Sequence, residues 1–252
     1  MKNKQNIKFY SVILGMCVIL IALCAFMMPK FPTYEITKMD GTQVKQDNEN
    51  EQNNDVPTFK GTDVPYVVID PGHGGYDIGS QSSDGRIVEN VYDLVVSNKI
   101  KTLLEKEGVK VLLTRTSDEV PWPSDNIKDL QARLDIATNA GADMMVSIHC
   151  NSSEEDPLNV SGSEVYANSK QANSVSLAES IVASLDALEP ELRSRGVKQG
   201  ALHLLTFNTI PTVIVEMGFL SNPDDVNYLY NEDTQNQICE KIAEGIINEL
   251  KK

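Results

Sequence analysis

Residues 66–75 read YVVIDPGHGG, an apolar run that leads into a glycine-rich segment. Its four apolar residues, Tyr66 to Ile69, predict a buried strand, because continuous apolar runs are typical of strands covered on both faces. The glycines that follow predict a turn where the backbone can approach a bound group closely. In open α/β sheets, ligands gather beyond the carboxyl ends of the strands, so this turn is a candidate functional site.

The rest of the chain continues the alternation that this stretch begins. Further strands are predicted at 109–113, 144–149, 163–166 and 212–215, and helices at 90–106, 130–140, 172–188 and 234–250. Short apolar runs that alternate with helical patterns are typical of an α/β sheet. We therefore expect one α/β domain over residues 65–252, with a mostly parallel or mixed central sheet flanked by helices.

The N-terminal residues differ in character from this domain. Three lysines precede a run from Phe9 to Met28 that carries no charge, and about 20 apolar residues suffice to cross a bilayer as a helix. We predict a signal-anchor segment at residues 1–29, with its lysines on the cytoplasmic side. A flexible polar linker is predicted at residues 30–64. The alternative is a cleaved signal peptide, and in both cases the domain is expected outside the cytoplasmic membrane.

Composition argues against some partners and some kinds of site. The net charge of -14 disfavours nucleic-acid binding, because phosphate contacts need clustered Lys and Arg. The four cysteines show no CxxC spacing, so neither a disulfide framework nor a thiolate zinc site is indicated. Cys150 follows His149 on a predicted strand, which directs the two side chains to opposite faces. We expect buried or lipid-facing thiols.

Three predicted strands lead into residues whose side chains can bind a metal ion or take part in catalysis. His73 follows the first strand, His149 ends the strand at 144–149, and Glu216 follows the strand at 212–215. A catalytic zinc usually has three protein ligands, His and carboxylate among them, and a fourth position for water. The two histidines are therefore candidate zinc ligands. The competing interpretation is that each is a hydrogen-bonded structural residue.

The third ligand stays open on spacing alone, since Asp70, Asp77, Asp84 and Glu89 all lie near His73. Other chemistries are poorly supported. The PGHGG run lacks the lysine of a phosphate-binding loop and the GxGxxG spacing, and no GxSxG motif is present.

Several motifs occur between residues 67 and 250, in the order VVIDPGHGGYDIGS, LLTRTSD, DLQARLDIA, GADMMVSIHCNSS, RGVKQGALHLL and PTVIVEMGFLSNPDD. This series resembles the zinc-dependent N-acetylmuramoyl-L-alanine amidases of the amidase-3 type. The resemblance implies that His73, Glu89 and His149 are the ligands of Zn2+. It also implies that Glu216 is the catalytic glutamate.

The function implied by the resemblance is hydrolysis of the amide bond between N-acetylmuramic acid and L-alanine in bacterial peptidoglycan. Peptidoglycan is then the expected partner, and the bacterial cell membrane is the expected anchoring site. A tethered catalytic domain without wall-binding repeats is similar to amidases of spore cortex maturation. The alternatives are a zinc peptidase that cuts within the stem peptide and a non-catalytic cell-wall-binding protein that retains the fold. The sequence names no protein activator.

The chain departs from the family pattern at a few positions. Thr138 stands where Asn is frequent, Thr206 where Arg is frequent, and His203 where Tyr or Phe is frequent. We interpret His203 as a surface or groove residue and not as a ligand. Arg115 and Asn151 are candidates for positioning substrate, although we expect structural roles for both.

Overall fold

The computed structural model describes residues 64–188 and 194–252. The predicted signal-anchor segment and all of the predicted linker except Val64 lie outside these residues. Within the described ranges, no helix is both long and apolar enough to span a membrane.

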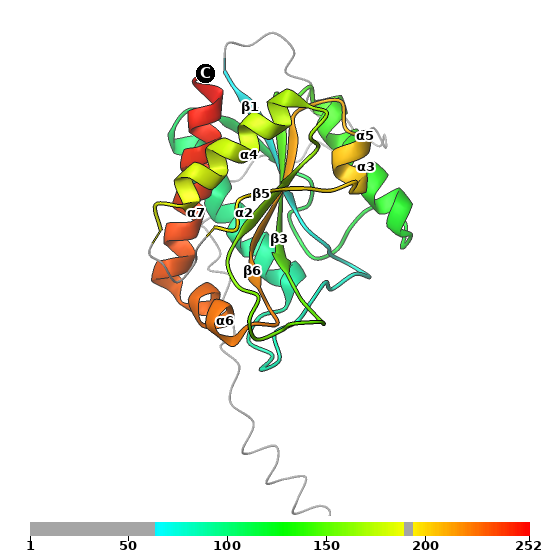
Figure 1. The fold of residues 1–252 in the computed structure, drawn as a ribbon. Coiled ribbons are helices and arrows are strands. Elements are labelled where there is room, and N and C mark those ends of the chain that lie inside the picture. Colours follow the sequence, from blue (N-terminus) through cyan, green and yellow to red (C-terminus); the bar gives the residue numbers. More distant parts are fainter. Residues whose placement is uncertain (1–63, 189–193) are drawn as a thin grey trace, which may run out of the picture. The chain divides into compact units, whose positions relative to one another are not determined.

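The centre of the described domain is a six-stranded sheet (Figure 1). Its strands are β1 (Tyr66–Pro71), β2 (Lys110–Leu113), β3 (Met144–Asn151), β4 (Glu164–Ala167), β5 (Val197–Gln199) and β6 (Thr212–Phe219). They lie in the order β2-β1-β3-β6-β4-β5. The first four strands in this order run parallel, whereas β4 runs antiparallel to β6 and parallel to β5. The sheet is therefore mixed.

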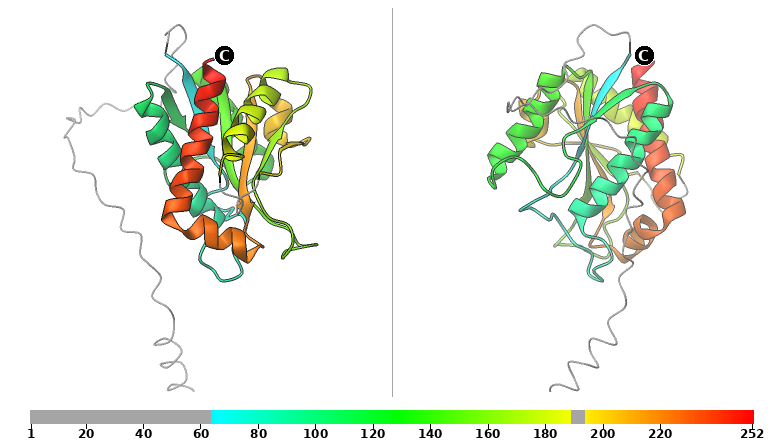
Figure 2. Two further views of the ribbon diagram at one scale, coloured as in Figure 1. Left: turned by 60° about the vertical axis from the view of Figure 1, so that its left-hand side comes forward. Right: turned by 180° about the vertical axis from the view of Figure 1, so that it is seen from behind.

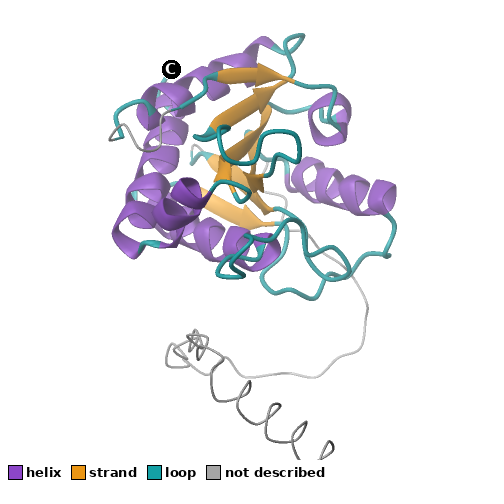
Figure 3. Ribbon diagram, turned by 60° about the horizontal axis from the view of Figure 1, so that its bottom comes forward, coloured by secondary structure: helices purple, strands orange, loops and turns teal. Residues whose placement is uncertain are grey.

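Helices cover both faces of this sheet (Figures 2 and 3). They are α2 (Glu89–Lys106), α3 (Asn126–Ala140), α4 (Ala172–Leu185), α5 (His203–Phe207), α6 (Pro223–Tyr230) and α7 (Glu232–Leu250). Helices α2, α4, α6 and α7 pack on one face, and α3 and α5 pack on the other.

Strand β1 shows why the opening stretch of sequence is apolar at every position. Val67 and Ile69 belong to the core beneath α2, α4 and α7, while Tyr66 and Val68 belong to the core beneath α3 and α5. Successive side chains of a strand point to opposite faces, so a strand buried on both faces must be apolar throughout.

The expected α/β sheet flanked by helices is confirmed, with differences at the ends of elements. Helix α3 begins at Asn126 rather than at 130, because the Asp125 side chain accepts a hydrogen bond from the Lys128 amide and caps the earlier turn. Helix α4 ends at Leu185 rather than at 188. The short elements β5, α5 and α6 were not predicted. Strand β6 continues to Phe219, which places Glu216 within the strand.

Candidate metal centre and catalytic groove

The strand order brings the three candidate segments together. Strands β1, β3 and β6 are consecutive neighbours in the sheet, and all three point the same way. His73 lies two residues beyond β1, His149 lies near the end of β3, and Glu216 on β6 is the register partner of His149. Glu89 is the first residue of α2. Residues far apart in sequence therefore meet at one edge of the sheet.

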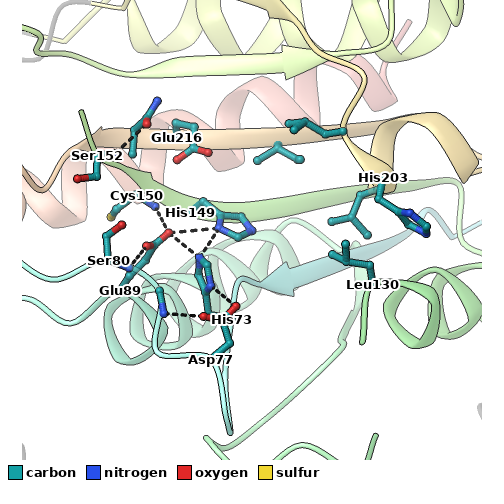
Figure 4. A pocket seen from close by; sticks show the side chains of 15 residues that line it. His73, Asp77, Ser80, Glu89, Leu130, His149, Cys150, Ser152, His203 and Glu216 are labelled. Atoms are coloured by element: carbon teal, nitrogen blue, oxygen red, sulfur yellow. Dashed lines mark hydrogen bonds and ion pairs between the residues drawn. The ribbon is translucent and has the colours of Figure 1, made fainter. Parts of the chain in front are cut away.

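Three side-chain atoms converge at this edge (Figure 4). His73 Nε2 lies 2.9 Å from Glu89 Oε1 and 3.1 Å from His149 Nδ1. The third side of the triangle, between His149 Nδ1 and Glu89 Oε1, measures 3.3 Å. With Asp93, these residues form a group whose ligand atoms all lie within 4.8 Å of one another, and the group could hold a metal ion.

Neighbouring groups fix the orientation of the converging side chains. His73 Nδ1 donates to Asp77 Oδ2 at 2.8 Å, which leaves Nε2 directed at the centre of the group. Glu89 Oε2 accepts from the Ser80 amide at 2.6 Å, and Glu89 Oε1 accepts from the Cys150 amide at 3.1 Å. Each carboxylate oxygen of Glu89 thus has its own backbone donor.

The electrostatics of the metal-free group follow from these contacts. Burial opposes a charge on His73, but the hydrogen bonds and charges of Glu89 and Asp77 outweigh it and raise the pKa of His73 to about 9. Burial also disfavours ionised Glu89, yet His149 and His73 hold the pKa of this carboxyl well below its usual range. The group is thus a dense cluster of coupled charges, which is typical of functional sites.

Two glycines make room for these side chains. A Cβ atom at Gly72 would lie 2.3 Å from Cε1 of His149, so any side chain there would displace the imidazole. A Cβ at Gly79 would lie 2.6 Å from Glu89 Oε2, and Gly79 has a φ of +66°, which other residues rarely adopt. The backbone at Gly72 and Gly79 therefore lies close to the His149 and Glu89 side chains.

The four acidic candidates for the third ligand have different positions. Only Glu89 belongs to the converging triangle, while Asp77 bonds to His73 from outside it. Asp70 is buried and bonded to Arg133, and Asp84 pairs with Arg86 on the surface.

Asp93 is a member of the group that sequence reasoning missed. It lies one helical turn after Glu89 on α2 and is fully buried, and its carboxylate oxygens have no hydrogen-bond partner among the described residues. Burial, together with the charges of Glu89 and Glu216, raises the pKa of Asp93 well above its usual value. The i, i+4 spacing from Glu89 was the available signal, because residues four apart share one helical face.

A groove of about 490 Å³ leads away from the cluster. Its lining is His73, Asp77, Gly79, Ser80, Glu89, Leu130, His149, Cys150, Asn151, Ser152, Leu202, His203, Leu204, Ile214 and Glu216. The cluster forms one end, and the side chains near α3 and α5, His203 among them, form the other (Figure 4). His203 is thus a groove residue, as expected from the sequence.

Glu216 lies along this groove beside the cluster (Figure 4). Its Oε2 atom has no hydrogen-bond partner among the described residues. Burial raises the pKa of Glu216 to about 7; the charges of Glu89 and Glu164 act in the same direction, and His149 opposes them. A carboxylate with a pKa near neutrality and no competing partner is suited to accept and release a proton.

The remaining candidate residues lie either in the groove or in the interior of the domain. Asn151 lines the groove and donates to Glu164 at 3.2 Å. Arg115 is buried and directs its donors at backbone carbonyls, as expected of a structural residue. Cys150 and Cys239 are buried free thiols, again as expected. The other two cysteines lie outside the described residues.

The chain is similar to known proteins over most of its described residues. Residues 67–248 match the Amidase_3 family, described as N-acetylmuramoyl-L-alanine amidase. The N-acetylmuramoyl-L-alanine amidase LytC of Bacillus subtilis is 31% identical over 184 residues, which cover 72% of this chain and 35% of LytC. The chain thus spans about a third of the length of that relative.

Two further similarities cover most of the matched protein. The germination-specific N-acetylmuramoyl-L-alanine amidase of Bacillus subtilis is 28% identical over 191 residues, 72% of this chain and 78% of that protein. The structure of the CwlD amidase from Clostridioides difficile in complex with the GerS lipoprotein is similar with a TM-score of 0.68 and 31% identity, covering 74% of this chain and 98% of that one. With a family match that extends over residues 67–248, the chain belongs to the N-acetylmuramoyl-L-alanine amidase family Amidase_3.

Proposed function

We propose that this protein is a zinc hydrolase that cleaves the amide bond between N-acetylmuramic acid and L-alanine in bacterial peptidoglycan. The observation that carries the proposal is the convergence of His73, Glu89 and His149 beside an unpartnered Glu216 in one groove. Family membership and the names of the relatives support the same bond as the target.

The spacing of the three converging atoms supports zinc as the metal. Ligand atoms about 2.0–2.2 Å from a tetrahedral zinc stand about 3.3–3.6 Å apart, and the observed separations of 2.9, 3.1 and 3.3 Å lie at or slightly below this range. Two imidazoles and one carboxylate are also an established ligand set for catalytic zinc, which keeps a fourth position for water. His73, Glu89 and His149 would hold the ion. When bound, zinc lowers the pKa of water and polarises the scissile carbonyl.

The protein's own groups supply the proton transfers. Glu216 accepts the proton of the attacking water and passes it to the departing amine of L-alanine. Asp77 holds His73 in the tautomer that keeps Nε2 free for the metal. The groove that Glu216 lines is the proposed binding place of the substrate.

The proposed site of action is outside the cytoplasmic membrane. Its support is the charge-free run from Phe9 to Met28 behind three lysines and the cell-wall names of the relatives. Residues 1–29 would anchor the protein in the bacterial cell membrane, and residues 30–64 would allow the domain to reach the wall. A role in spore cortex maturation is supported by the similarity to a germination-specific amidase.

Digestion of purified peptidoglycan distinguishes this proposal from its alternatives. After incubation with the protein, with and without zinc, mass spectrometry should find intact stem peptides with a free L-alanine amine and glycan strands that lack stems. Cleavage products within the stem would identify a peptidase. Unchanged peptidoglycan with retained binding of the wall would identify a non-catalytic binding protein.

A further inference from the structure

His73 has a backbone conformation that needs support. Its φ of 57° is the only positive value at a non-glycine residue in the described ranges. Such a conformation is strained and persists where surrounding contacts determine it. The contacts that hold this backbone therefore help to determine where the imidazole lies.

One of these contacts comes from Arg133, which is 2% exposed on α3. Its Nη2 donates to the carbonyl of His73 at 2.6 Å, and its Nη1 donates to the carbonyl of Pro71 at 2.8 Å. The same guanidinium is itself held by Asp70 at 2.9 Å and by Asp129 at 2.6 Å. Arg133 thus fixes the strained residue against β1.

A second buried arginine joins this loop to the helix that carries Glu89. Arg115, 3% exposed, donates from Nε to the carbonyl of Pro71 at 3.0 Å. Its Nη2 donates to two carbonyls at 2.6 Å each, those of Gly72 and Asn90. Gly72 precedes His73 and Asn90 follows Glu89, so one nitrogen atom connects the residues next to both side chains.

We propose that Arg115 and Arg133 are positioning residues that establish the metal-binding geometry of His73 and Glu89 before the metal arrives. This inference rests on the proposed zinc site. Together the two guanidinium groups bind the carbonyls of three consecutive residues, Pro71 to His73, and that of Asn90. Neither residue reaches the groove lining, so each acts through the ligands and not on the substrate.

The chemistry of arginine explains why this residue type occupies both positions. A guanidinium presents five donors in a rigid plane and stays charged when buried, so it can bind several carbonyls that diverge from one another. Lysine carries the same charge at a single flexible nitrogen and cannot reproduce the contacts of Nε and both Nη atoms. Buried charge is compensated at Arg133 by Asp70 and Asp129.

The test measures the zinc dissociation constant of the full-length protein by competition with a chromophoric chelator. The variants are Arg115→Lys and Arg133→Lys, each checked for folding by circular dichroism and thermal unfolding. Loss of an interaction that orients metal ligands typically weakens metal binding about 10–100-fold, and this is the expected result for both. If one variant fails to fold, the zinc dissociation constant of the other variant decides the test.

The matched control is Leu185→Ala, which removes a buried side chain from α4 without touching the groove or the loop. It should lower the unfolding temperature and leave the zinc dissociation constant unchanged. The inference is overturned if the folded arginine variants bind zinc as the wild type does, or if the control weakens zinc equally. A wild type that binds no zinc would refute the proposed site, and the inference with it.

Discussion

Replacing Glu216 by Gln should stabilise the metal-free protein at neutral pH while it removes catalysis. The pKa of Glu216 is raised from 4.5 to about 7 in the folded state, mainly by burial. Below pH 4.5 the carboxyl is protonated in both states and has no effect. Above this value the unfolded chain releases its proton while the folded protein retains it, so stability is lost progressively as the pH rises from 4.5 to 7.

The size of the effect follows from the difference between the two pKa values. Each pH unit of difference corresponds to about 1.4 kcal/mol, so a rise from 4.5 to about 7 corresponds to roughly 3 kcal/mol once Glu216 is ionised. Solvent in the groove screens part of this cost, and we expect a gain of about 1–3 kcal/mol for Glu216→Gln at pH 8. At pH 5 the gain should be much smaller.

Urea unfolding in the presence of a chelator measures this gain for the wild type and the variant at both pH values. Glu240→Gln makes the same chemical change on the exposed side of α7 and controls for the loss of one negative charge. The reasoning is refuted if the difference between wild type and Glu216→Gln is the same at pH 5 and pH 8. It is equally refuted if the variant is the less stable protein at pH 8.

Three further predictions concern the metal, the chemistry and the N-terminus. His73→Ala or His149→Ala should abolish stoichiometric zinc binding in metal analysis, and a zinc-loaded wild type that retains no metal would contradict the central proposal. Glu216→Gln should keep its zinc while turnover falls by about 10²–10⁴-fold. Glu89→Gln should instead lose zinc affinity, with activity partly restored by added metal; the reverse pattern would exchange the two roles. Removing residues 1–29 should release a soluble folded domain, and a shorter soluble form in the native cell would show that the segment is cleaved.

The long elements of the fold were predictable because their periodicity is strong. Helices α2 and α7 span 18 and 19 residues, enough turns for an apolar face to be recognised. Strand β5 and helix α5 contain 3 and 5 residues and are too short to show a period. Helix α6 was missed although Asn222 caps it and Asn231 caps α7, which separates the two helices.

The site was predictable to the extent that sheet topology determines it. His149 and Glu216 lie on parallel strands and His73 follows a third, and the ends of such strands meet wherever the strands are neighbours. Glu89 lies on a helix, and its approach to His73 depends on the path of the intervening loop. The spacing of residues in the sequence does not reveal the path of this loop. Only the family resemblance selected Glu89 from the acidic candidates. The contacts of Arg115 depend on tertiary packing in the same way.

Gly72 shows how a position without a side chain can be among the least tolerant of mutation. Even alanine there would add a carbon atom 2.3 Å from the His149 ring. In a deep mutational scan scored by cell-wall cleavage, Gly72 should therefore rank with the residues that perform the chemistry. Gly72 is therefore expected to be essential because it has no side chain, which leaves room for the His149 ring.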